Sequence, residues 1–240
     1  MISSSEPTTP WPLNLEVATY FESLRTLIWK EMIAEWRSRE ALSAMFFFSV
    51  TSLLIFNFAL DLSPVSAQDV VPGILWVTFL FASLLGLNRS FQREKEQSSI
   101  EGLMLAPVGR SAIYVAKMVG NFLFLLVIEL VALPVMVALF NVALPLSILP
   151  VLLLGTLGLS AAGTIFAAMA INTRLRDVLL PLMLLPVVVP LLVGSVQATG
   201  AVMGGNSLLG SASSSILLIV AFDVIFLTLP SLLFEYVLEE

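Results

Sequence analysis

Long apolar stretches are the feature that most limits what this chain can fold into. Six of them are close to the ~20 apolar residues that a helix needs to cross a bilayer. They cover approximately residues 42–60, 71–88, 114–139, 148–171, 178–197 and 216–234. Barrel strands would show a polar residue at every second position, and these stretches do not. The sequence therefore predicts an all-α, polytopic membrane protein with six transmembrane helices.

The composition agrees with this prediction and limits the chemistry. The 240 residues are 58% hydrophobic and 12% charged, whereas a soluble domain normally carries about 25% charged residues. The chain has no cysteine, and it also has no histidine, which is the commonest general base and the usual haem ligand. We therefore expect no catalytic residue, no metal site and no directly bound cofactor.

Lysine and arginine gather at alternate connectors between the apolar stretches. The eleven cations are Arg25, Lys30, Arg37, Arg39, Arg89, Arg93, Lys95, Arg110, Lys117, Arg174 and Arg176. The connectors 61–70, 140–147 and 198–215 contain none of them. Because cations resist translocation and collect on the cytoplasmic side, this distribution predicts that both termini are cytoplasmic and that the number of spans is even.

The segment before the first apolar stretch has an amphipathic pattern. Hydrophobic residues recur at helical spacing, with two tryptophans nearby: Val17, Tyr20, Phe21, Leu24, Leu27, Ile28, Trp29 and Trp36. We interpret residues 13–40 as a helix in the cytoplasmic membrane interface, with a soluble helical arm as the alternative. Residues 1–12, which contain three prolines, are expected to be a disordered lead, and 41–240 the transmembrane domain. The Gly/Ser-rich stretch 199–215 is expected to be a flexible outer loop.

Two acidic residues fall inside predicted spans. Glu129 lies near the middle of the third span, and Asp223 lies about two turns into the sixth. An ionised group there costs at least ~2.5 kcal/mol, so such residues usually face the interior of the bundle. Each could contact a substrate path or a partner, or could be a protonated acid that hydrogen-bonds a neighbouring helix. We favour the second interpretation for Asp223 and leave both open for Glu129. The two acids are not expected to lie at matched depth, which counts against an intramembrane enzyme.

The fourth span contains a run of small residues, GTLGLSAAG, at 155–163. Thr156 and Ser160 form one small-x-x-x-small pair, and Gly158 and Ala162 form another. Small residues at this spacing let helix backbones approach closely in membranes. The run therefore predicts tight packing around the fourth span.

The connector between the second and third spans, SFQREKEQSSIEGLMLAP at 90–107, is unusually polar. Ser98 and Glu101 have the spacing of a capping box, which starts a helix. Ile100, Leu103 and Met104 would then form one apolar face. A short amphipathic helix near 98–106 suits a coupling helix that docks on a separate motor protein. Spacing alone leaves an ordinary solvated loop equally open.

Three segments of the chain resemble one family of transporter subunits. They are residues 72–91, PGILWVTFLFASLLGLNRSF; residues 101–117, EGLMLAPVGRSAIYVAK; and residues 154–194, which begin LGTLGLSAAG. Together they are similar in order and spacing to the cytochrome c maturation protein B family (CcmB, haem exporter protein B). The N-terminal arm is longer than the usual start of that family.

The resemblance implies an ABC-2-like permease in a bacterial-type inner membrane. Its partners would be a separate ABC ATPase, a haem-handling membrane protein, a small helper subunit and a haem chaperone. ATP hydrolysis by the ATPase would drive haem delivery or release of the haem-loaded chaperone, with haem as the cargo of the complex. The chain itself has no G-x-x-x-x-G-K-[ST] motif and so binds no nucleotide through a P-loop.

On this interpretation, the polar connector supplies the contacts with the ATPase. The predicted interface residues are Glu94, Glu96, Ile100, Glu101, Leu103 and Met104, and Arg89 and Arg93 are predicted to anchor the connector at the lipid headgroups. Two other functions share parts of the pattern. One is a general ABC-2-type exporter of a lipid, glycan or drug, and the other is a secondary transporter driven by an ion gradient, against which the sparse intramembrane charge counts.

Overall fold

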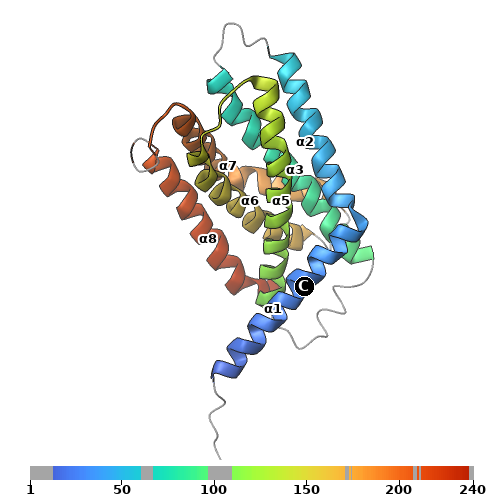
Figure 1. Ribbon diagram of the computed structural model, residues 1–240. Helices are drawn as coiled ribbons and strands as arrows, with labels where there is room; N and C mark the ends of the chain where they lie inside the picture. Colours follow the sequence, from blue (N-terminus) through green and yellow to red (C-terminus); the bar gives the residue numbers. More distant parts are fainter. Residues whose placement is uncertain are drawn as a thin grey trace, which may run out of the picture.

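The protein is a bundle of long helices in the computed structural model (Figure 1). The structure describes residues 13–60, 67–96, 110–170, 173, 175–207, 210 and 212–237. Its helices are α1 (Leu13–Ser38), α2 (Glu40–Ala59), α3 (Ala67–Glu96), α5 (Arg110–Phe140), the 3-10 helix η1 (Leu146–Ile148), α6 (Leu149–Ala170), α7 (Arg176–Met203) and α8 (Ser213–Val237). Within these ranges no residue forms a β-strand.

The transmembrane helices match the apolar stretches of the sequence. Within the described residues, five helices are long and apolar enough to cross a membrane, namely α2, α3, α5, α6 and α7, and α8 contributes a shorter apolar helix over Ser213–Thr228. The prediction of an all-α polytopic membrane protein is therefore confirmed. In Figure 1, α2 and α5 start and α3 and α8 end at the same end of the bundle.

The prediction of an outer loop at 199–215 is wrong at both ends of that range. Helix α7 continues to Met203, and α8 already begins at Ser213. Ala198 and Thr199 are fully buried, and the Trp76 indole Nε1 donates a hydrogen bond to Thr199 Oγ1 at 2.9 Å. Packing against α3 therefore keeps the chain helical, although glycine and β-branched residues have low helix propensity.

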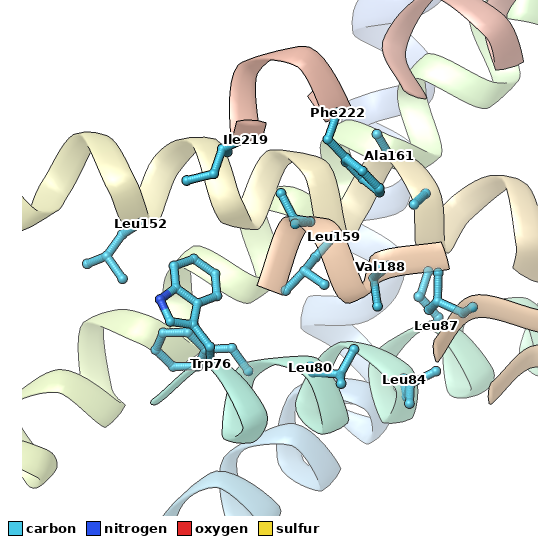
Figure 2. Packing of buried hydrophobic residues seen from close by; sticks show 14 of the residues in the cluster. Trp76, Leu80, Leu84, Leu87, Leu152, Leu159, Ala161, Val188, Ile219 and Phe222 are labelled. Atoms are coloured by element: carbon cyan, nitrogen blue, oxygen red, sulfur yellow. The ribbon is translucent and has the colours of Figure 1, made fainter. Parts of the chain in front are cut away.

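Helix α6 is the centre of the bundle and contacts α3, α5, α7 and α8. Figure 2 shows Leu152, Leu159 and Ala161 of this helix among labelled side chains of α3, α7 and α8. Its glycines make the close approach possible. A Cβ on Gly155 would lie 2.1 Å from Trp76 Cη2, and one on Gly163 would lie 2.4 Å from Leu87 Cδ1. The tight packing that the GTLGLSAAG run predicts is what the structure shows.

Helix α1 lies outside the bundle, across the end at which α5 begins (Figure 1), and contacts mainly α5. It ends at Ser38, and Arg39 turns the chain into α2 with a left-handed backbone conformation, φ 58°. The sequence predicts one continuous helix over residues 13–40, whereas α1 ends at Ser38 and residue 40 already belongs to α2. Residues 1–12 lie outside the described residues, and the division into a lead, an interfacial helix and a permease domain stays a prediction.

Candidate functional site

The predicted ATPase interface falls mostly outside the described part of the chain. Ile100, Glu101, Leu103 and Met104 belong to the segment 97–109, between α3 and α5, which the structure does not describe. For these four residues, the assignment stays a prediction.

The remaining interface and anchor residues belong to the last turns of α3. The backbones of Arg93, Glu94 and Glu96 are helical, but their side chains are not described. Arg89 is exposed on the same helix. The structure therefore describes the two helices that flank the predicted site, the end of α3 and the start of α5. It does not test the predicted contacts with the ATPase.

A buried charge links α1 to the start of α5. Lys117 Nζ of α5 lies 3.6 Å from Glu31 Oε1 of α1, and the Lys117 side chain is only 5% exposed. Lys30 Nζ lies 3.7 Å from the same oxygen at a more exposed position. A Cβ on Gly120 would be 3.5 Å from Glu31 Cβ, so the glycine gives Glu31 room against α5. Removing one partner of a buried pair leaves an uncompensated charge, so the loss of either Glu31 or Lys117 is expected to weaken the contact between α1 and α5.

A second acid of α1 fixes the turn into α2. Glu35 is buried, and its Oε1 accepts a hydrogen bond from the Leu42 backbone N–H at 3.0 Å. The first N–H groups of a helix lack partners within the helix, so this carboxylate caps α2 from outside. The Arg39 N–H donates to Glu35 O at 2.7 Å. The angle between α1 and α2 is thus held by side-chain and backbone bonds together.

Sequence reasoning missed both of these contacts. Glu31 and Lys117 are 86 positions apart (117 − 31), and nothing in the sequence pairs them. The available signal was the position of Lys117, a cation inside the predicted third span. Such a residue needs a partner.

A polar seam joins α5 and α6 inside the bundle; we define it by Thr156, Ser160 and Thr164 of α6 with their partners on α5. Thr156 Oγ1 donates to Glu129 Oε1, and both residues are buried. Ser160 Oγ donates to Met118 O at 2.6 Å. The Asn121 amide Nδ2 donates to Thr164 Oγ1 at 3.1 Å. The three α6 residues are four positions apart, so they lie on one face of the helix.

Glu129 is therefore part of a packed helix–helix contact. Its side chain is 3% exposed and faces the bundle interior. The hydrogen bond from Thr156 matches the interpretation of an acid bonded to a neighbouring helix. The other interpretation, a contact with a substrate path, is not tested by this geometry.

Asp223 occupies a different kind of position between α8 and α6. It is also 3% exposed, and a Cβ on Gly158 would lie 2.5 Å from its Oδ1. Neither carboxylate oxygen has a hydrogen-bond partner among the described residues. The bond to a neighbouring helix that the sequence suggested for Asp223 is thus not formed within the described chain.

The two acids lie at similar depth, contrary to expectation. Glu129 bonds Thr156, and Asp223 packs on Gly158, only two residues further along α6. Two residues span about 3 Å along a helix axis and point roughly 200° apart around it. Sequence counting missed this because the two acids enter the membrane on different helices, from opposite ends. Helix α6 separates the two groups, and no set of three acidic side chains in the described residues could hold a metal ion.

The helical bundle and its buried contacts define an α-helical polytopic membrane protein. Charged residues lie at the end where α5 begins, and the central helix α6 is rich in small residues. The family model described as CcmB protein matches residues 22–239, so this chain belongs to the CcmB family. The family that the sequence resembles is thereby confirmed.

Curated relatives agree with the family match. The chain is 33% identical over 174 residues to heme exporter protein B of Pseudomonas aeruginosa, which covers 68% of this chain and 75% of that one. It is 30% identical over 175 residues to heme exporter protein B of Bradyrhizobium diazoefficiens, covering 72% and 78%. A third protein of this name, from Haemophilus influenzae, is 29% identical over 67% of this chain and 73% of its own.

Proposed function

We propose that this chain is the membrane permease subunit of an ABC-type haem exporter that serves c-type cytochrome maturation. The family match over residues 22–239 carries the proposal, and relatives named heme exporter protein B support it. Haem is then the cargo of the complex rather than a group bound by this chain. The subunit resides in the bacterial inner membrane with both termini in the cytoplasm, as the cation distribution predicts.

The proposed mechanism is mechanical. A separate ABC ATPase docks on the segment between α3 and α5. Ile100, Leu103 and Met104 of this segment fit into a groove of the ATPase, and the neighbouring acidic residues contact basic residues of the ATPase. ATP-driven closure of the ATPase displaces this segment. The end of α3 and the start of α5 move with it. Both helices pack on α6, so the displacement reaches the core of the bundle. Haem delivery, or release of the haem-loaded chaperone, follows at the outer face.

The link between α1 and α5 supports this transmission. Lys117 lies seven positions after the first residue of α5, close to the proposed docking segment, and pairs with Glu31. We therefore expect a shift at the start of α5 to move α1 as well. The haem-handling membrane protein, the small helper subunit and the chaperone complete the proposed complex.

The decisive experiment is deletion of the gene followed by haem staining of c-type cytochromes. We expect staining to disappear in the deletion strain and to return with the wild-type gene. Normal staining in the deletion strain would overturn haem export and favour the general ABC-2-type exporter, which shares this architecture.

The docking contacts are tested in the same strain with two variants. Replacing Leu103 and Met104 by Asp should abolish both co-purification with the ATPase and staining, because buried charges are excluded from an apolar groove. The matched control is Gly102→Asp, which lies on the opposite face of the predicted helix and should leave both intact. Membrane insertion of every variant is checked by immunoblot. Unchanged co-purification of the Leu103→Asp/Met104→Asp protein would remove the assignment.

A further inference from the structure

A groove of about 420 Å³ opens on the outside of the bundle, between α2 and α5. Its walls are apolar, formed by Phe46 and Phe47 of α2 and by Val127 and Val131 of α5, and these side chains are more than a third exposed. Arg39 lies at one end of the groove, where α2 begins. The site thus combines one cation with an apolar channel, and its volume is in the range of ligand sites, about 300–1,000 Å³.

We expect the cationic end of the groove to lie at the level of the membrane interface. On α1, just before Arg39, Trp29 is 67% exposed and Trp36 is 71% exposed, and Ile33 between them is also exposed. Their spacing puts all three on one outward face of the helix. Exposed tryptophans concentrate at headgroup depth. We therefore expect Arg39 to lie among the headgroups, with Phe46 and Phe47 further along α2, toward the hydrocarbon.

Arg39 also has an unfavourable backbone conformation. Its φ is 58°, a left-handed value that glycine or asparagine adopts far more readily than arginine. An arginine at such a position points to a requirement for its side chain. Among the described residues, no acidic group forms an ion pair with Arg39, and the nearby Glu35 carboxylate accepts the Leu42 N–H. The guanidinium is thus available for an anion from outside the chain.

We propose that this groove binds an anionic diacyl phospholipid. The Arg39 guanidinium holds the headgroup phosphate, for which its planar fork of donors is well suited. One acyl chain lies along α2 against the aromatic side chains and the valines of α5. The charge, the depth and the apolar walls each match one part of such a lipid. The proposal does not depend on what the protein transports.

Native mass spectrometry of the full chain in detergent tests the proposal directly. Phosphatidylglycerol and phosphatidylcholine with identical acyl chains serve as probes. We expect bound phosphatidylglycerol to exceed phosphatidylcholine by roughly fivefold, the contribution of one cation near a negatively charged lipid. Equal binding of the two lipids would overturn the proposal and would fit a groove that a partner's transmembrane helix covers instead.

Matched variants separate charge from backbone effects. Arg39→Gln and Arg39→Lys carry a similar left-handed strain, and only the glutamine should lose the preference for phosphatidylglycerol. Should the glutamine variant fail to fold, Arg39→Asn removes the charge while relieving the strain. Arg37→Gln, an exposed position on α1 outside the groove, should keep the preference. Loss of the preference with Arg37→Gln, or its retention with neutral residues at position 39, would overturn the assignment.

The apolar part of the groove has its own test. Val131→Trp fills the channel at an exposed position, so it should reduce the binding of both lipids while leaving their ratio near the wild-type value. Unchanged binding of both lipids would show that no acyl chain lies there and would overturn the proposal.

Discussion

The two buried acids of this protein lie on either side of one helix in contrasting surroundings. Glu129 belongs to the polar seam between α5 and α6 and accepts a hydrogen bond from Thr156. Asp223 packs against Gly158 on the other side of α6, and neither of its oxygens has a partner among the described residues. A buried polar group with a partner contributes to a unique packing, whereas one without a partner opposes folding. From this difference we predict that the Glu129 bond contributes to stability and that the Asp223 carboxyl group contributes little to it.

The largest effect is expected from Thr156→Val. Valine keeps the shape of threonine but removes the only hydrogen bond that the buried Glu129 side chain makes within the described residues. We expect the free energy of unfolding to fall by about 2–3 kcal/mol, the cost of leaving a buried acceptor unsatisfied. The measurement is equilibrium unfolding of the detergent-solubilised protein by SDS.

A control for this change lies two turns along the same seam. Thr164→Val removes the bond from the Asn121 amide, which is less deeply buried than Glu129 (7% against 3% exposed), so the free energy of unfolding should fall by less, about 1 kcal/mol. If Thr156→Val proves no worse than Thr164→Val, the special role given to the Glu129 bond is wrong.

A smaller loss, about 1–2 kcal/mol, is expected from Gly158→Ala, which probes the Asp223 side of α6. The new Cβ would lie 2.5 Å from Asp223 Oδ1 and 2.8 Å from Leu191 Cδ2. Both are side-chain atoms that have to move, and overpacking of this kind destabilises a core. The same SDS titration reports it. Gly73→Ala is the control, because no atom lies within 4 Å of its new Cβ, and it should be neutral or slightly stabilising. Equal losses in the two variants would show that the α6–α8 contact is not tight.

The smallest change in stability is expected from Asp223→Asn. The two side chains have nearly the same shape, and no described hydrogen bond is lost, so the free energy of unfolding should change by less than about 1 kcal/mol. We nevertheless expect haem staining of c-type cytochromes in the complemented deletion strain to decrease, and unchanged staining would show that the Asp223 carboxyl group is not needed for function. A loss of stability as large as that of Thr156→Val would remove the contrast between the two acids.

Much of the fold follows from sequence because bilayer thickness fixes the length of an apolar helix. The small-residue run at 155–163 correctly indicated the most closely packed helix. The ends of helices were harder, since Thr199 stays helical through a bond from Trp76, 123 positions away. The shared depth of Glu129 and Asp223 likewise depends on how three helices pack, which no local pattern records. The predicted coupling residues at 100–104 lie in undescribed sequence and stay a prediction.

The pairing of Glu31 with Lys117 has a consequence for how the protein is made. At about 5–20 residues per second, a ribosome needs roughly 4–17 seconds after adding Glu31 to reach its partner, 86 residues later. During that interval the first helix has left the ribosome without the surface on which it finally rests. Attachment of the amino-terminal arm is therefore a late event in biogenesis, and it can begin only after two hydrophobic segments have entered the bilayer and the third has started to emerge.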